Sequence, residues 1–243
     1  MIKSFNMATT PERFDYALKT IESIYDQADV IRVYLNNFKS IPKKLIDKKI
    51  LAQIGPDMCC SGRLLWAKFP DQYYFIIDDD IIYPKNYSKD MLRCLKNLND
   101  KALVSLHGKI LNKNILSNYF KDHLEIFHYQ KGFKKSRYVT VIGAGVCLFN
   151  TNYVSINIDT FQYNYMDDIE ISIQLQKQKI PAVVIAHDHN YLKSIDLYKE
   201  KNIVTLFSRY LNDDETQTER YNQINWKINK FFNIFKILNL KID

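Results

Sequence analysis

The stretch YYFIIDDDIIYP, residues 73–84, decides the fold prediction. Its first five residues, Tyr73 to Ile77, are apolar in succession, which is typical of a strand buried on both faces of a sheet. Three adjacent carboxylates, Asp78, Asp79 and Asp80, follow directly. Side chains at the carboxyl end of a buried strand lie where open α/β sheets bind their ligands. The sequence therefore predicts an α/β sheet with a ligand site at this edge.

The residues on the amino-terminal side of this stretch predict a β-α-β unit. Residues 2–7 and 30–35 have the composition of strands. Between them, Thr9-Thr10-Pro11-Glu12 matches a capping box with an early proline, which predicts a helix start. Apolar residues then recur at helical spacing: Phe14, Leu18, Ile21 and Tyr25. A β-α-β order indicates parallel strands.

The remaining chain alternates between the two kinds of element. Strands are predicted over 48–54, 102–107, 138–150 and 182–186, and helices over 63–69, 89–98, 166–178 and from residue 222 on. We expect one α/β domain over residues 1–221, with a mostly parallel central sheet flanked by helices. A helical tail over residues 222–243 completes the expected organisation.

The bulk composition fits a globular protein with anionic partners. The chain has 243 residues, 47% of them hydrophobic, and a net charge of +7. This charge favours phosphate-bearing ligands, nucleic acid or an anionic membrane surface. The four cysteines form no C-x-x-C pair, so neither a zinc site nor a redox motif is expected. No secretory signal and no apolar run of membrane-spanning length is present, which favours a cytoplasmic location.

The three adjacent acids indicate a metal site. Like charges at this spacing repel one another, and the apolar strand before them reduces their solvation. A divalent cation relieves that conflict, and carboxylate oxygens suit Mg²⁺ or Mn²⁺, which would bridge to nucleotide phosphates. Strand alternation puts Asp78 and Asp80 on one side and Asp79 on the other. The alternative interpretation is a solvated turn with three surface acids.

The same stretch resembles the nucleotide-sugar site of GT-A fold glycosyltransferases of the family-2 type. In those enzymes a strand leads into a D-x-D motif, as it does here before Ile81-Ile82-Tyr83-Pro84. Residues 9–13 resemble the start of the sugar-donor site, and Asp167-Asp168 lies where inverting members keep their catalytic base. The resemblance implies a Rossmann-like GT-A fold. One departure is Leu35-Asn36-Asn37, where the family has an acid-rich turn.

The resemblance implies roles for individual residues. Those expected to bind the sugar donor are Thr9, Arg13, Asn36, Arg63, Asp78 and Asp79. Asp78 and Asp80 are the expected ligands of Mn²⁺ or Mg²⁺, with His189 or His187 as a further ligand; the alternative is that these histidines are structural. Arg63 has a second interpretation, as a solvated helix arginine. Its functional interpretation is that a guanidinium can fork onto a diphosphate.

Asp167 and Asp168 are the expected catalytic residues. An inverting transfer needs a base that takes the proton from the acceptor hydroxyl. We assign this role to Asp168, and assign Asp167 as a helix cap or as a ligand of the acceptor hydroxyl. The alternative is that both carboxylates simply cap the helix that begins there.

The tail predicts a basic amphipathic helix. Its apolar residues at helical spacing are Ile224, Ile228, Phe231, Phe232, Phe235 and Leu238, and its lysines lie largely off that stripe. Such a helix can lie on the inner face of the plasma membrane, pack on its own domain, or pack on a second subunit.

Together these features favour a transferase that moves a sugar from a nucleotide-sugar, expected to be a UDP-sugar, to a glycan or lipid-linked acceptor. Bacterial capsule or lipopolysaccharide synthesis is the expected setting. The alternative is a metal-dependent nucleotidyltransferase or nuclease that uses the same acids. Nucleic acid is not an expected partner, because the best basic run, residues 131–137, holds a single aromatic residue, Phe133. A third possibility, a non-catalytic sugar-binding or scaffold module, does not explain a buried acidic cluster.

Overall fold

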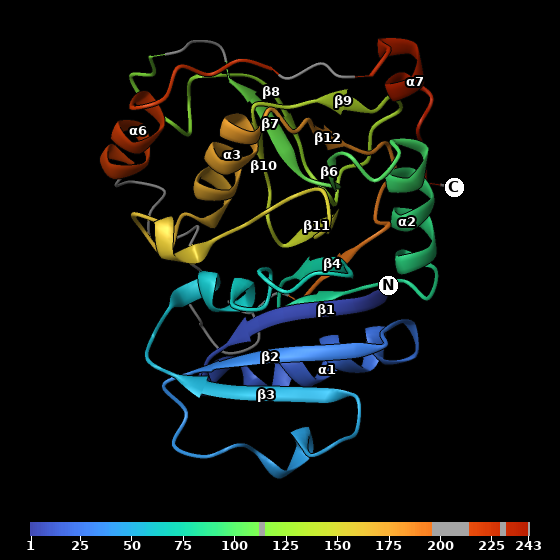
Figure 1. Ribbon diagram of the computed structural model, residues 1–243, viewed down its shortest axis with the longest axis vertical. Coiled ribbons are helices and arrows are strands. Elements are labelled where there is room, and N and C mark those ends of the chain that lie inside the picture. Colours follow the sequence, from blue (N-terminus) through green and yellow to red (C-terminus); the bar gives the residue numbers. More distant parts are fainter. Residues whose placement is uncertain (112–114, 196–213, 229–231, 243) are drawn as a thin grey trace.

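A mixed sheet of eight strands forms the centre of the structure (Figure 1). The computed structural model describes residues 1–111, 115–195, 214–228 and 232–242. Across the sheet the strands follow the order β3-β2-β1-β4-β11-β6-β12-β9. Their bounds are β1 (Ile2–Thr9), β2 (Val30–Asn36), β3 (Ile50–Gly55), β4 (Gln72–Ile77), β6 (Leu103–Ser105), β9 (Arg137–Tyr138), β11 (Val146–Asn150) and β12 (Ala182–Val184).

The prediction of a mostly parallel sheet is wrong. β11 runs antiparallel to both of its neighbours, β4 and β6, and β9 runs antiparallel to β12. The strands from β3 to β4 are parallel, as are β6 and β12. All five residues of β11 are buried. A fully buried strand has the same apolar pattern in either direction, so the sequence did not indicate the reversal.

The first β-α-β unit is confirmed, but its predicted capping box does not form. Helix α1 (Phe14–Ile24) connects the parallel strands β1 and β2 and is preceded by a short 3-10 helix, η1 (Pro11–Arg13). Thr10 is the residue before η1, and its side chain makes no capping hydrogen bond. The hydroxyl of Thr9 instead donates to Asp79. The residue chosen as a cap therefore belongs to the acidic cluster.

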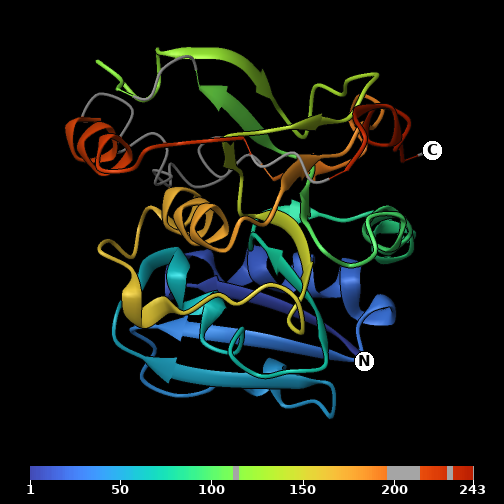
Figure 2. The ribbon, with the colours of Figure 1, turned by 45° about the horizontal axis from the view of Figure 1, so that its top comes forward.

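The two faces of the large sheet carry different helices (Figures 1 and 2). α1 and α2 (Tyr87–Asn97) pack on the face that holds Phe5 and Phe75, whose rings stack 4.3 Å apart. α3 (Asp167–Gln178) and the 3-10 helix η4 (Cys59–Leu64) cover the face that holds Tyr74 and Ile76. The predicted helix over residues 63–69 is wrong, because η4 ends at Leu64 and turns follow it.

Smaller elements complete the fold. A three-stranded antiparallel sheet is ordered β10-β7-β8, with bounds β7 (Gly108–Leu111), β8 (His123–Phe127) and β10 (Val141–Ile142). A two-stranded sheet pairs β5 (Ile81–Ile82) with β13 (Lys193–Ser194). The other helices are η2 (Tyr25–Gln27), η3 (Lys43–Leu45), η5 (Ile158–Thr160), α6 (Glu215–Asn222) and α7 (Ile234–Leu238). β7 and β8 were not predicted.

The described part of the tail packs on the domain and does not form one long helix. Residues 223–228 have no regular structure, and the only helix assigned within the described part of the tail after Asn222 is α7. Ile237, Leu240 and Ile242 are buried in the main core, and Phe232 packs against it. The predicted tail residues 229–231 lie outside the described residues. Within the described residues, no helix is both long and apolar enough to cross a membrane.

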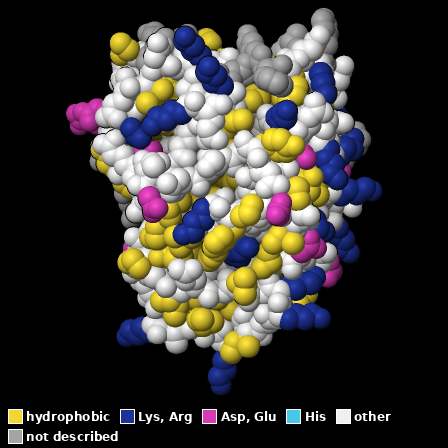
Figure 3. Space-filling model, viewed as in Figure 1, with side chains coloured by type: hydrophobic (Ala, Val, Ile, Leu, Met, Phe, Trp, Pro, Cys, Tyr) yellow, Lys and Arg dark blue, Asp and Glu magenta, His cyan; other side chains and the backbone are white. Residues whose placement is uncertain are grey.

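The surface carries both basic and hydrophobic side chains. Lys and Arg side chains line the right-hand edge of the face shown in Figure 3. Hydrophobic side chains gather in the lower half of the same view, over β2 and β3. Leu51 on the edge strand β3 is 54% exposed.

Candidate functional site

The predicted site lies where the strand order changes direction. The chain adds β2 and then β3 on one side of β1, and then places β4 on its other side. The carboxyl ends of β1 and β4 therefore lie at the point of the strand order where open α/β sheets bind their ligands. Thr9 ends β1, and Asp78 directly follows β4. Two segments that are far apart in the chain thus meet at one edge, where Thr9 and Asp79, 70 positions apart, form a hydrogen bond.

Asp79 joins these two strand ends. Its Oδ2 accepts a hydrogen bond of 2.7 Å from the Thr9 hydroxyl. The guanidinium of Arg13 donates to both Asp79 oxygens, with Nε 3.0 Å from each. The Asp79 side chain is only 6% exposed. Its acceptor sites are thus occupied by the protein, so Asp79, Thr9 and Arg13 hold the edge together.

Asp78 turns toward a different set of partners. Its carboxylate pairs with Nη1 of Arg63, and its backbone N–H contacts the Gly145 carbonyl at 3.2 Å. The buried Tyr83 hydroxyl accepts from the Asp78 N–H and donates to the same carbonyl at 2.7 Å. A Cβ on Gly145 would overlap the Asp78 carboxylate, so this position requires glycine. With 39% of its side chain exposed, Asp78 is the most open of the three acids.

Asp80 lies at the rim of the same cluster. Its Oδ2 is 3.1 Å from Nη2 of Arg13, and its side chain is 21% exposed. Burial raises the pKa of Asp80 to about 7, and the charges of Asp79 and Asp78 add to this effect. The Asp80 carbonyl accepts a 2.8 Å bond from the N–H of Ile195, just after β13. The chain that follows β12 therefore returns to the acidic cluster.

Asp167 and Asp168 begin α3, as predicted. Asp167 is buried and accepts from Nε and Nη2 of Arg63 at 3.0 and 2.7 Å. Asp168 is half-buried, and its Oδ1 accepts a 2.6 Å bond from the N–H of Ala144. Burial raises the pKa of Asp168 to about 7, and the neighbouring charge of Asp167 contributes. A carboxyl group with this pKa exchanges its proton readily near neutral pH.

Arg63 connects the acids that follow β4 with the acids that begin α3. Its side chain is 6% exposed and reaches Asp78 after β4 and Asp167 at the start of α3. A further bond runs from Nη1 to the Ile77 carbonyl at 3.2 Å. The bonds to these three partners use all the nitrogens of the guanidinium. Arg63 is therefore a buried bridge within the site, and the interpretation as a solvated helix arginine is wrong.

Asn36 lies beside this site and holds the segment that leads into η4. It ends β2 and is buried. Its side-chain amide donates to the Cys59 carbonyl at 3.0 Å, and its oxygen accepts from the Met58 N–H at 2.9 Å. Both polar ends thus hold the segment that enters η4, the helix that carries Arg63.

His187 and His189 occupy different surroundings from the acids. Both ring nitrogens of the buried His187 lie 2.9 Å from backbone carbonyl oxygens, those of Ile185 and Tyr129. His189 is exposed. Both histidines line a cavity of about 500 Å³ that also includes Asp188 and Lys241. Among the described residues, no group of three or more His, Cys, Asp or Glu side chains is arranged to hold a metal ion.

Asp78 and Asp80 nevertheless fit a divalent cation that has other ligands as well. Both carboxylates are partly exposed, and each has only an arginine as its charged partner among the described residues. Burial and the charges of Asp79 and Asp78 raise the pKa of Asp80, and a bound cation would offset both effects by favouring the ionised carboxylate. Mg²⁺ in particular is commonly held by one or two carboxylates together with substrate phosphates and water.

Three further residues near the acids were not predicted. Lys109 on β7 faces Asp168, which opposes the lowering of the lysine pKa by burial. His107 lies against Gly143, and burial lowers its pKa to about 3. The Tyr129 hydroxyl contacts Ser194 at 2.6 Å. Each is a single residue in or beside a short element, without a sequence spacing that would have marked it.

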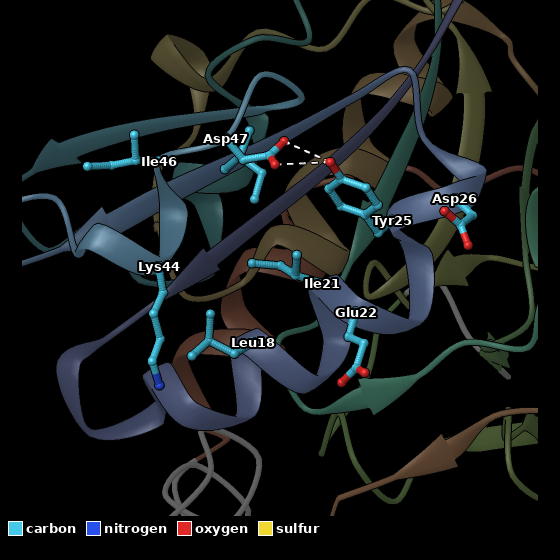
Figure 4. Close-up of a pocket in the computed structure, with 9 residues that line it drawn as sticks. Leu18, Ile21, Glu22, Tyr25, Asp26, Lys44, Ile46 and Asp47 are labelled. Atoms are coloured by element: carbon cyan, nitrogen blue, oxygen red, sulfur yellow. Dashed lines mark hydrogen bonds between the residues drawn. The ribbon is translucent and has the colours of Figure 1, made fainter.

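A separate cavity of about 440 Å³ lies between α1 and the segment before β3 (Figure 4). Tyr25 donates to both oxygens of Asp47 across it, each at 3.0 Å. Its lining includes none of the predicted site residues.

No protein-family model matches the chain, and no curated protein matches it at a significant level. The residues of this chain are therefore the basis for inferring its function.

Proposed function

We propose that this protein is a metal-dependent glycosyltransferase with a nucleotide-sugar donor and an inverting mechanism. The single observation that carries the proposal is the Arg63 bridge between Asp78 and Asp167. On one side of this bridge are acids that suit a cation, which would in turn bind a diphosphate. On the other side is the start of α3, which carries the candidate base Asp168. Transfer of a sugar to a hydroxyl requires both functions within one site. The α/β sheet is, in this proposal, a GT-A fold.

Asp168 is the proposed base. The Ala144 N–H fixes one carboxylate oxygen, and the other is then available to an acceptor hydroxyl. As that hydroxyl oxygen attacks the anomeric carbon, its proton moves to Asp168, and the bond from this carbon to the diphosphate oxygen breaks. The raised pKa of Asp168 makes it a stronger base than an ordinary carboxylate.

Asp78 and Asp80 are the proposed ligands of Mn²⁺ or Mg²⁺. When bound, such a cation supplies positive charge to the departing nucleoside diphosphate. Thr9, Arg13 and Asp79 serve this arrangement by fixing the strand ends on which the two ligands stand. Asn36 and Arg63 act in the same way, since Asn36 holds the segment that enters η4 and Arg63 bonds to the end of β4.

A panel of UDP-, GDP-, CMP- and dTDP-sugars tests the proposal. Release of the nucleotide and the free sugar is measured with Mn²⁺, with Mg²⁺ and with EDTA. We expect metal-dependent turnover of at least one sugar nucleotide, and an inverted anomeric configuration in the first-formed product. Turnover that EDTA does not affect would contradict the metal role, and a retained configuration would contradict Asp168 as base.

The alternative, a nucleotidyltransferase or nuclease, is separated by the same panel. Such an enzyme would consume nucleoside triphosphates or nucleic acid and leave sugar nucleotides intact. Asp79 and Asp167 are buried in their ion pairs with arginines, so the more exposed Asp78 and Asp80 are the carboxylates open to a metal, which favours one metal ion over two. We therefore favour the glycosyltransferase.

A further inference from the structure

Lys109 has an unusual setting for a lysine. It lies on β7, is half-buried, and carries its Nζ atom 3.3 Å from the centre of the Tyr119 ring. The Phe120 ring is 5.3 Å away. Within the described part of the chain, no hydrogen bond or ion pair of its ammonium group is found. An ammonium group has three N–H donors, and leaving them unpaired in a partly buried place is costly.

The residue that faces Lys109 is the proposed base. Lys109 lies opposite Val141 of β10; the next residue, Ile142, donates its N–H to Ser172, whose hydroxyl donates to the Asp168 carbonyl. Asp168 is also the carboxylate whose charge acts on Lys109, and the two side chains form no ion pair. One oxygen of Asp168 is already held by the Ala144 N–H. The Tyr119 ring, against which the ammonium of Lys109 lies, is itself buried. The N–H donors of Lys109 therefore lie near the point where the acceptor hydroxyl would bind.

We propose that Lys109 binds an anionic group, either a phosphate or a carboxylate, on the acceptor substrate beside the hydroxyl that Asp168 deprotonates. This inference rests on the proposed function. An anion supplies oxygen acceptors that the described residues do not offer to this ammonium group, and the aromatic contacts favour a cation at this position. The diphosphate of the sugar donor is expected at Asp78 and Asp80, so it does not fill this role. The acceptor is consequently a phosphorylated lipid or glycan, or one with an acidic sugar.

Two anionic probes and their neutral counterparts test the inference. Glycerol 3-phosphate is compared with glycerol, and glucuronate with glucose, in the presence of UDP and Mg²⁺. Lysine ammonium signals are followed by NMR on the full chain labelled with ¹⁵N-lysine; Mg²⁺ is used because Mn²⁺ would broaden nearby signals. The variants are Lys109→Met and Lys109→Arg. Lys101→Met is the matched control, since Lys101 also lies over a tyrosine ring, that of Tyr153, at 5.7 Å.

We expect at least one anion to shift the Lys109 signal with a millimolar dissociation constant, and the neutral counterparts to leave it unchanged. The preferred anion distinguishes a phosphate from a carboxylate acceptor. Lys109→Met should weaken binding of that anion about tenfold or more, Lys109→Arg should retain most of it, and Lys101→Met should behave as wild type. UDP binding should be unchanged in all three variants.

The inference is overturned if neither anion shifts the Lys109 signal in the wild-type protein, or if the neutral probes bind equally well. It is also overturned if Lys109→Met weakens UDP binding in place of anion binding, which would assign the lysine to the sugar donor. Because the wild-type signal is read directly, a variant that fails to fold does not prevent the test. Failure of UDP to bind the wild-type protein with Mg²⁺ would instead count against the proposed function.

Discussion

Asp79 and Asp168 are both largely shielded carboxylates at the same edge of the sheet, but their surroundings differ. Asp79 accepts bonds from Thr9 and Arg13 on both oxygens. Asp168 accepts one from the Ala144 N–H, and the cation that faces it, Lys109, makes no ion pair with it. Burial raises the pKa of Asp168 to about 7.

This difference indicates that Asp79 has a structural role and that Asp168 can take part in proton transfer. A carboxylate whose acceptor sites are filled by arginine and threonine stabilises the fold and has no free lone pair for a substrate. A carboxylate held at one oxygen keeps the other for proton transfer. We therefore expect substitutions on the Asp79 side to change stability more than turnover, and those on the Asp168 side to change turnover more than stability.

The largest expected effect is that of Asp168→Asn on turnover. Asparagine keeps the shape of the side chain and an oxygen for the Ala144 N–H, but it cannot take up a proton near neutral pH. We expect turnover to fall by about 10²–10⁴-fold while UDP affinity stays near wild type. Asp159→Asn, an exposed acid in η5, is the control and should have no effect. A parallel loss of UDP affinity would place Asp168 in the sugar-donor site.

Arg63→Met should cause the largest loss of stability. It removes the cation between Asp78 and Asp167 and leaves the buried Asp167 without the cation that pairs with it. Breaking a buried ion pair from one side costs about 3–5 kcal/mol in the free energy of unfolding. Urea unfolding measures this loss. Arg137→Met is the control, because among the described residues the Arg137 side chain donates only to the carbonyls of Lys135 and Ser136. A loss below that of the control would contradict the bridge.

In contrast to Arg63→Met, Asp168→Asn should increase stability, and the increase should grow as pH rises. Its pKa in the folded state, about 7, is above the ordinary value of 3.8. Between these two values the folded protein holds a proton that the unfolded chain has released, so wild-type stability falls as pH rises toward 7. Asp168→Asn lacks this loss. In EDTA, we expect the variant to gain about 2 kcal/mol relative to wild type between pH 5 and pH 8. An unchanged difference would show that the Asp168 pKa is not raised.

The smallest expected effect is that of Thr9→Val, which removes one of the bonds to Asp79 and keeps the size of the side chain. Arg13 still satisfies both Asp79 oxygens. The variant should lose about 1–2 kcal/mol of stability, and its turnover should stay within a few-fold of wild type. Thr160→Val, at an exposed threonine, is the control. A collapse of turnover with intact stability would mean that Thr9 contacts the substrate.

The first β-α-β unit and β4 could be predicted because their signals are local. The apolar run before Asp78, the helical spacing in α1 and the β-branched residues of β2 each indicate their element within a few residues. The direction of β11 could not be predicted, since it depends on where the segment after β10 is inserted, between β4 and β6. β7 and β8 also pair through contacts that leave no strong alternation in the sequence.

The candidate site shows the same division. Asp78 to Asp80 and Asp167-Asp168 stand out as adjacent acids at the ends of predicted elements. That Arg63 joins the two groups depends on its position in η4, which the predicted helix over 63–69 missed. Lys109 has no local signal, because its meaning comes from Asp168 and Tyr119, which reach it only in the folded chain. Tertiary contacts of this kind have no period in the sequence.

Calorimetric titration with UDP, with and without Mn²⁺, tests the central claim. The claim is that the acids after β4 bind the metal and the acid on α3 acts as base, as two separable functions of one site. The proteins compared are wild type, Asp80→Asn and Asp168→Asn. The account predicts Mn²⁺-dependent UDP binding in wild type, its loss in Asp80→Asn and its retention in Asp168→Asn. UDP binding that needs no metal, or that survives Asp80→Asn and disappears in Asp168→Asn, would contradict it.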